Sequence, residues 1–212
     1  MFADQTWLAR LIWLALAGVF LNALALWRLE LAFVALATLA LSLAPVVAAR
    51  WADIHVPPGL ITAVVLFVGA TLFLGEVFGF YDRFWWWDIV MHGTSAIAFG
   101  LIGFVLVFMM FQGDRYAAPP LALAFLAFCF AISIGTAWEI FEFAMDRLFG
   151  FNMQKSGLMD TMGDLIVNMI GALIGAAVGF GYLKGQARGG LATLIDEFVY
   201  RNPRFFKRFR RK

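Results

Sequence analysis

Cysteine and charged residues are scarce in this sequence. One cysteine, Cys129, is present among the 212 residues, so the chain cannot form an internal disulfide. Its neighbours are mostly Phe and Ala, and we expect it to serve packing only. Asp, Glu, Lys and Arg make up 14% of the residues, whereas 63% are hydrophobic. This balance excludes an ordinary soluble globular domain and indicates an integral membrane protein.

The chain also lacks the features that divide a sequence into domains. No Ser-, Pro- or Gly-rich linker, low-complexity tract or fixed-period repeat interrupts the hydrophobic segments. Hydropathy predicts six helices of about 20 residues, the length that crosses a bilayer core. The predicted spans are 10–27, 31–49, 60–80, 89–111, 120–143 and 162–182. We therefore expect an all-α polytopic membrane protein, in which residues 1–183 form a single bundle of about six transmembrane helices.

The first two predicted spans are separated by only three residues, Arg28, Leu29 and Glu30. A continuous helix from 11 to 49 would be about 58 Å long at 1.5 Å per residue, much longer than the bilayer is thick. We therefore expect a tight turn at 28–30 instead of one long helix.

The distribution of Lys and Arg predicts the orientation in the membrane. If both termini lie on one side, that side carries Arg10, Arg50, Arg115 and the nine basic residues from Lys184 onward. The opposite side carries Arg28, Arg83, Arg147 and Lys155. Because the side with more positive charge faces the cytoplasm, both termini are predicted to be cytoplasmic.

Residues 184–212 are predicted to form a basic amphipathic cytoplasmic tail. The stretch LATLIDEFVY is amphipathic, and the final RNPRFFKRFRRK alternates Phe with cations, a pattern suited to anionic membrane lipids. The simpler alternative is a positively charged anchor with no further role. No nucleic-acid-binding module accompanies these cations, so nucleic acid is not an expected partner.

Polar residues follow helical spacing in the last three predicted spans. The three sets are Asp88, His92 and Ser95, then Glu139, Glu142 and Asp146, and then Asp160, Asp164 and Asn168. The third set continues along the same helix face into Gly171, Gly175 and Gly179. The predicted topology places all three sets near the outer membrane face, where the sequence also puts Glu76 near the end of the third span.

Ionised carboxylates in a transmembrane helix cost at least ~2.5–3.5 kcal/mol on insertion scales, so they face the bundle interior and are paired, protonated or bound to cations. The acidic residues near this face are Glu76, Asp82, Asp88, Glu139, Glu142, Asp146, Asp160 and Asp164, and the cations are Arg83, Arg147 and Lys155. This excess of negative charge predicts a bound divalent metal. The expected ligands are Asp88, His92, Glu139, Glu142, Asp160 and Asp164.

Carboxylates and one imidazole favour Mg²⁺, Mn²⁺ or Ca²⁺, and Zn²⁺ is less expected because Cys ligands and a second His are missing. Protons on some carboxylates are the competing explanation. Structural alternatives also exist for single features. Asp88 and His92 are spaced as a hydrogen-bonded pair at a helix end, and the glycines suit close helix packing.

Three motifs resemble those of the YjdF-type bacterial inner-membrane family, which is grouped with VanZ-like proteins. They are Tyr81-Asp82-Arg83 with a downstream His92, WEIFE at 138–142, and DTMGDLIVNMIGA at 160–172. The resemblance covers roughly Phe73 to Phe180. His92 follows Arg83 by nine residues, so Asp88 is better placed than Asp82 to pair with it. The resemblance implies a multi-pass protein of the bacterial inner (plasma) membrane, and the family has no assigned reaction.

Three functions fit these observations. The first is a metal-dependent hydrolase or transferase acting on a lipid-linked or envelope substrate, with His92, Asp88 and Asp164 as the catalytic residues. The second is an ion- or proton-coupled transporter that uses the same carboxylates. The third is a non-catalytic assembly subunit in an oligomer or with a partner membrane protein. No recognisable nucleophile or phosphate-binding motif supports the enzyme, and no inverted repeat or broken helix supports the transporter.

Overall fold

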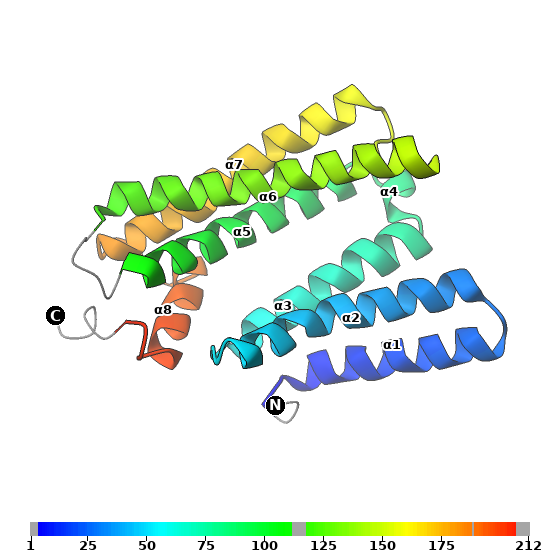
Figure 1. Ribbon diagram of the computed structural model, residues 1–212, viewed down its shortest axis with the longest axis horizontal. Coiled ribbons are helices and arrows are strands. Elements are labelled where there is room, and N and C mark those ends of the chain that lie inside the picture. The colour runs from blue at the N-terminus through cyan, green and yellow to red at the C-terminus, as the bar shows by residue number, and fades with distance from the viewer. Residues whose placement is uncertain (1–3, 112–117, 188, 207–212) are drawn as a thin grey trace. The chain divides into compact units, whose positions relative to one another are not determined.

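The computed structural model describes residues 4–111, 118–187 and 189–206, which form helices and connecting loops without β-strands (Figure 1). The elements are α1 (Trp7–Ala25), α2 (Leu29–Trp51), α3 (Pro58–Val68), the π-helix η1 (Gly69–Val77), α4 (Phe80–Arg83), α5 (Trp87–Phe111), α6 (Pro120–Phe149), α7 (Leu158–Leu183) and α8 (Leu191–Arg201). The prediction of an all-α polytopic membrane protein is confirmed.

Among the described residues, six helices are long and apolar enough to cross a membrane. They are Trp7–Ala25, Leu29–Trp51, Pro58–Val77, Trp87–Phe111, Pro120–Phe149 and Leu158–Leu183. Each corresponds to one predicted span. The largest difference is in α6, which continues six residues beyond the predicted end at 143. Hydropathy ends a span at the first run of charged residues, but Asp146 and Arg147 lie within the last helical turns.

The helices group into two compact units, Met1–Trp87 and Asp88–Lys212, where the sequence predicted a single bundle. The units are described separately. In the first unit, α1 and α2 are joined by the predicted tight turn. Trp27 has a φ of 55°, and the Arg28 amide donates to the Ala23 carbonyl at 2.8 Å.

The first unit has a small core between α1, α2 and α3. Ala9, Trp13, Val46, Ile61 and Val65 are buried together. The Trp13 indole N–H donates to the Ser42 hydroxyl at 3.1 Å, so a polar group inside this apolar core is satisfied. Glu76 lies in η1 and Asp82 in α4, so both belong to the first unit and not to the unit that holds the other acidic motifs.

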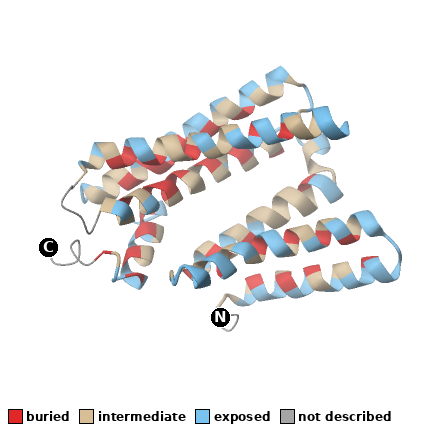
Figure 2. Cartoon of the chain, in the orientation of Figure 1, coloured by how far each residue is buried: buried red, intermediate tan, exposed pale blue. Residues whose placement is uncertain are grey.

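In the second unit, α5, α6 and α7 lie side by side, and their buried residues face one another (Figure 2). The glycine stripe of α7 packs directly on α5. A Cβ at Gly171 would lie 2.7 Å from the Gly93 carbonyl oxygen, and a Cβ at Gly175 would lie 2.6 Å from the Ile97 carbonyl oxygen. Gly179 similarly faces the ring of Phe104. The interpretation of this stripe as a close helix contact is therefore confirmed.

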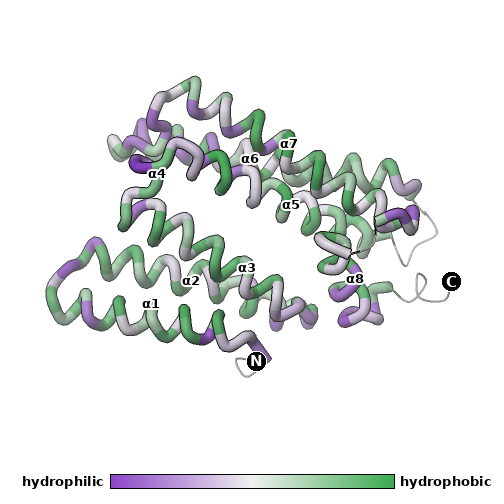
Figure 3. The backbone as a smooth tube through the Cα atoms, turned by 180° about the vertical axis from the view of Figure 1, so that it is seen from behind, coloured by the Kyte–Doolittle hydropathy of each residue, from purple (hydrophilic) through white to green (hydrophobic). Residues whose placement is uncertain are grey.

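Helix α8 covers the end of this bundle. Its residues Ala192, Ile195 and Val199 are buried, and they belong to one core with Phe104 and Phe108 of α5. Figure 3 shows more polar residues in α8 than along the spans. The amphipathic stretch of the sequence thus forms helix α8, and its apolar side packs on the protein. Residues 188 and 207–212 of the predicted tail lie outside the described residues.

Candidate metal centre between the last three spans

The three polar motifs occupy the same end of the second unit. Asp88 and His92 lie in the first turns of α5, and Asp160 and Asp164 lie in the first turns of α7. Glu139 and Glu142 lie in the C-terminal half of α6. Because α6 and α7 are consecutive antiparallel helices, the end of one meets the beginning of the other (Figure 1). Residues far apart in the sequence are thus brought to one level of the bundle.

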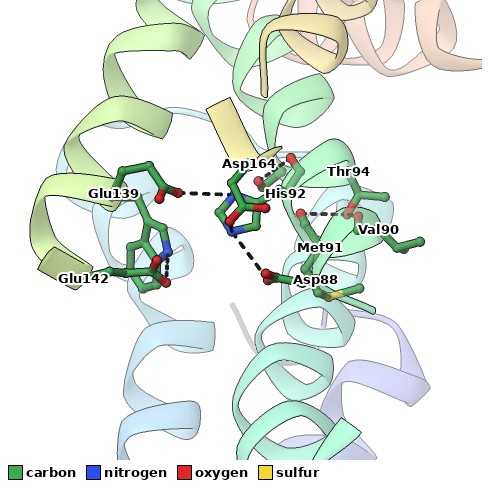
Figure 4. Close-up of polar contacts among 10 residues, drawn as sticks. Asp88, Val90, Met91, His92, Thr94, Glu139, Glu142 and Asp164 are labelled. Carbon is green, nitrogen blue, oxygen red and sulfur yellow. Dashed lines mark hydrogen bonds and ion pairs between the residues drawn. The ribbon is translucent and has the colours of Figure 1, made fainter. Parts of the chain in front are cut away.

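His92 is the centre of this group (Figure 4). Its Nε2 atom lies 3.5 Å from Asp88 Oδ1 and 3.8 Å from Asp164 Oδ2. Its Nδ1 atom lies 3.8 Å from Glu139 Oε1. One imidazole therefore faces two aspartates with one nitrogen and a glutamate with the other.

Most of the group is shielded from solvent. His92 is 8% exposed, Glu139 3% and Asp164 5%. The Asp88 side chain is 33% exposed, so it marks the side from which the group can be reached. The Asp164 Oδ2 atom and both carboxylate oxygens of Glu139 are buried and accept no hydrogen bond of normal geometry from the described residues, although Thr161 lies near Glu139. Buried carboxylates without partners are energetically costly, so this arrangement calls for a cation, a proton or water.

The positions of Asp88, His92 and Asp164 fit a metal ion. One ligand atom from each residue lies within 4.8 Å of the other two. Ligand atoms bound at about 2.1 Å to a tetrahedral ion lie roughly 3.4 Å apart. The distances of 3.5 and 3.8 Å from His92 Nε2 to the two carboxylates are close to this value.

Glu142 lies beside this triad and has a partner of its own. The Trp138 indole N–H donates to Glu142 Oε1 at 2.9 Å, and Glu142 is 9% exposed. The pairing of Trp138 with Glu142 was missed in the sequence, although their i, i+4 spacing on α6 is compatible with it. Among the six predicted metal ligands, Asp160 is partly exposed in the first turn of α7 and, like Glu142, does not belong to the triad.

Asp146 and Asn168 have structural surroundings. Asp146 accepts hydrogen bonds from the backbone amides of Met153 at 2.7 Å and Gln154 at 2.9 Å, so it organises the loop between α6 and α7. Asn168 is 2% exposed, and its Nδ2 atom donates no hydrogen bond to the described residues. It lies one turn deeper than Asp164 on α7 and packs against Gly135.

The hydroxyl groups of Ser95 and Thr94, which follow His92 on α5, donate hydrogen bonds to backbone carbonyls. Ser95 Oγ donates to the His92 carbonyl at 2.9 Å, and Thr94 Oγ1 donates to the Val90 carbonyl at 2.7 Å. Neither hydroxyl is paired with the imidazole. In this structure Ser95 and Thr94 are therefore not arranged as a nucleophile with His92 as its base.

Comparison with known proteins gives a family and no activity. An uncharacterized protein of Thermotoga maritima is 30% identical over 115 residues, which cover 50% of this chain and 56% of that protein. The chain thus spans about half the length of this relative. No solved structure matches the chain. Residues 7–185, which include all six spans and the candidate metal centre, match a family described as "Predicted membrane protein (DUF2238)". This chain belongs to the DUF2238 family of membrane proteins.

Proposed function

We propose that this protein binds a divalent cation between α5 and α7 and uses it in catalysis within the membrane. The ligands are Asp88 Oδ1, His92 Nε2 and Asp164 Oδ2. The observation that carries the proposal is that two carboxylates from different helices face the same ring nitrogen in a buried place. This arrangement is typical of a metal centre and unusual for a purely structural contact.

The charge balance supports a cation in this position. Two ionised aspartates and a neutral imidazole carry a net charge of about −2, which a divalent ion neutralises. Without a cation or a proton, two carboxylates less than 5 Å apart repel each other strongly in a medium of low dielectric constant. A bound ion therefore stabilises the contact of α5 with α7 as well as providing a reactive centre.

The proposed reaction is a hydrolysis or group transfer on a lipid-linked or envelope substrate. A divalent ion supplies polarisation of a phosphoryl or carbonyl oxygen and activation of water. Asp88 is the most exposed of the three ligands, so we place the approach of the substrate on its side of the centre. His92 has carboxylates at both nitrogens, so we assign it the role of metal ligand and not that of proton donor or acceptor. Glu142, held by Trp138, becomes the candidate proton acceptor.

The cellular setting belongs to the same proposal. Both termini in the cytoplasm would put the metal centre near the outer face of a bacterial inner membrane, where lipid-linked envelope precursors are accessible. The sequence resemblance to YjdF-type and VanZ-like proteins supports this location. Membrane lipids are then the immediate partners, and a lipid-linked substrate reaches the site from the bilayer.

A second candidate function is proton- or ion-coupled transport. The observation that favours it is Glu139, whose two buried carboxylate oxygens accept no normal hydrogen bond from the described residues. Its Oε1 atom lies 3.8 Å from His92 Nδ1. Such a residue can take up and release a proton. A transporter would require protein-dependent ion flux across the membrane, whereas the enzyme requires turnover of a substrate on one side of it.

The proposed cation site is tested by thermal unfolding of the purified full chain in detergent. Wild type, Asp164→Asn and Asp196→Asn are treated with chelator and then mixed with Mg²⁺, Ca²⁺, Mn²⁺ or Zn²⁺. Asp196 is exposed in α8, so Asp196→Asn makes the same chemical change away from the site. A cation that binds the folded state raises its melting temperature by mass action.

We expect at least one ion to raise the melting temperature of wild type and Asp196→Asn, and to raise that of Asp164→Asn much less. No response of wild type to any of the four ions would overturn the metal centre. In that case a sharp loss of stability in chelator-treated Asp164→Asn would indicate a structural or assembly role for the group.

A further inference from the structure

The two nitrogens of His92 have different surroundings. Nε2 faces Asp88 and Asp164, whereas Nδ1 faces Glu139 Oε1 at 3.8 Å (Figure 4). A neutral imidazole carries one proton, so one nitrogen donates and the other offers a lone pair. The partner of the protonated nitrogen decides which nitrogen can bind a metal.

We infer that Glu139 is a positioning residue that holds the proton of His92 on Nδ1, and that the centre therefore selects first-row transition ions such as Mn²⁺, Co²⁺ and Zn²⁺ over Mg²⁺ and Ca²⁺. This inference rests on the cation site proposed above. It assigns Glu139 a role outside the ligand set. Of the Mg²⁺, Mn²⁺ and Ca²⁺ predicted from the sequence it keeps only Mn²⁺, and it favours Zn²⁺, which the sequence analysis expected less.

Glu139 is suited to this role by its burial and its lack of another strong partner. It is 3% exposed, and neither oxygen accepts a normal hydrogen bond from the described residues. The neighbouring carboxylate on α6, Glu142, is held by Trp138. The distance of 3.8 Å from Nδ1 exceeds a hydrogen bond of ~2.9 Å by about 0.9 Å, so the inferred role requires the two side chains to approach each other when an ion binds.

The choice of ion follows from the donor atoms. Mg²⁺ and Ca²⁺ prefer shells made of oxygen ligands, six for Mg²⁺ and six to eight for Ca²⁺. The triad offers one imidazole and two carboxylates, a set that first-row transition ions accept readily. A carboxylate on Nδ1–H makes the opposite nitrogen a stronger base and fixes the plane of the ring. Glu139 thus increases the affinity for transition ions, which bind nitrogen well, relative to the affinity for Mg²⁺ and Ca²⁺.

The tautomer of His92 can be measured directly, because the chain has only two histidines and their signals are easily assigned. Without an ion, Asp88 and Asp164 compete for a proton on Nε2, so the measurement is made on metal-loaded protein. Nitrogen NMR of ¹⁵N-histidine-labelled, Zn²⁺-loaded protein at pH 8 gives one pair of side-chain signals for each histidine, and His55→Asn identifies the pair of His92. We expect His92 in wild type to bind the ion through Nε2 and to be protonated on Nδ1. In Glu139→Leu, which removes the acceptor, this preference should be lost, and in Glu139→Gln, which keeps an acceptor oxygen, it should be retained. Protonation of wild-type His92 on Nε2 would overturn the role of Glu139.

Metal titration of the same proteins tests selectivity and separates this inference from the proposed function. We expect Zn²⁺, Mn²⁺ or Co²⁺ to bind wild type more tightly than Mg²⁺ or Ca²⁺, and Glu139→Leu to weaken binding of these ions by ~10–100-fold. Glu139→Gln, which keeps the shape, should lose less and serves where Glu139→Leu does not fold. Equal affinity for Mg²⁺ and Zn²⁺, or unchanged affinity in Glu139→Leu, overturns this inference and leaves the site standing. No binding of any ion to wild type overturns both.

Discussion

Gly135 of α6 faces Asn168 of α7 so closely that a Cβ at position 135 would lie 2.8 Å from the Asn168 Nδ2 atom. Glu139 follows Gly135 by one helical turn, and Asp164 precedes Asn168 by one turn on the antiparallel helix. The Gly135–Asn168 contact therefore lies one helical turn farther into the span than Glu139 and Asp164. It limits the distance between α6 and α7 next to the place where Glu139 faces His92.

Gly135→Ala is expected to destabilise the protein by ~1–3 kcal/mol, because the added methyl group would overlap the buried side chain of Asn168. Gly163→Ala is the matched control in α7, where an added Cβ meets nothing within 4 Å. There, alanine should stabilise by ~0.5–1 kcal/mol through its helix propensity. Unfolding in detergent measures both changes. Equal effects of the two substitutions would mean that the close approach of α6 to Asn168 does not exist.

Gly175→Ala tests the contact between α5 and α7. A Cβ at this position would lie 2.6 Å from the Ile97 carbonyl oxygen, which is backbone and cannot rotate away. Separating the helices should increase the distance between Asp164 and Asp88, so metal-dependent stabilisation should decrease together with thermal stability. Gly163→Ala should leave the metal response intact. A Gly175→Ala protein with a full metal response would show that the centre does not depend on this helix contact.

The spans could be predicted from sequence because a helix that crosses the bilayer must be apolar along about 20 residues, which hydropathy detects. For example, α5 begins and ends within two residues of its predicted span. The convergence of Asp88, His92 and Asp164 followed from helical spacing combined with the alternating direction of successive spans. Both arguments use only the sequence and the geometry of a helix, and they were sufficient to choose the right face of each helix.

The roles of individual acidic residues could not be predicted in this way. Glu142 and Asp160 share faces with Glu139 and Asp164, but only Glu139 and Asp164 lie within 4 Å of His92, and only Asp164 belongs to the triad. The position of a residue along its helix, and not only its face, decides which oxygen reaches His92. Asp146 follows the same periodicity as Glu142, yet it binds the backbone of the following loop. Periodicity gives the face of a helix and not the partner of a side chain.

The amphipathic pattern of α8 also had two possible meanings in the sequence. A helix with one apolar side packs equally well on a membrane surface and on the end of a bundle. Helix α8 packs on a core that contains Phe104 and Phe108 of α5. The hydropathy of the tail alone contains no information about these two residues.

Trp138→Phe is expected to lower the stability of the folded protein, because Glu142 loses a hydrogen bond. The substitution keeps an aromatic ring but removes the N–H that donates to Glu142 Oε1 at 2.9 Å, which leaves a buried carboxylate oxygen without its partner. The expected cost is ~1–3 kcal/mol. In the double mutant Trp138→Phe, Glu142→Leu the carboxylate is absent, so Trp138→Phe should then cost much less. A cost that is the same with and without Glu142 would place the effect in ring packing.

Ile195→Ala tests whether α8 is part of the folded bundle. Ile195 is 1% exposed in the core that contains Phe104, so its truncation should cost ~2–5 kcal/mol of stability. Tyr200→Ala on the same helix is the control, because Tyr200 is 69% exposed. Unfolding in detergent and limited proteolysis of the tail provide the measurements. Indistinguishable variants would indicate that α8 does not pack on the bundle in solution.

Cysteine labelling tests the predicted orientation through the two ends of α7. The α6–α7 loop and the segment after α7 lie at opposite ends of this span, and Asn152 and Gln186 are exposed in them. A Cys129→Ala background removes the native thiol. Because the segment after α7 leads into the strongly basic end of the sequence, it should face the cytoplasm. Asn152→Cys should then react with a membrane-impermeant maleimide in intact cells, and Gln186→Cys should react only after permeabilisation. The reverse pattern would put the metal centre on the cytoplasmic side, where lipid-linked substrates of the outer leaflet cannot reach Asp88.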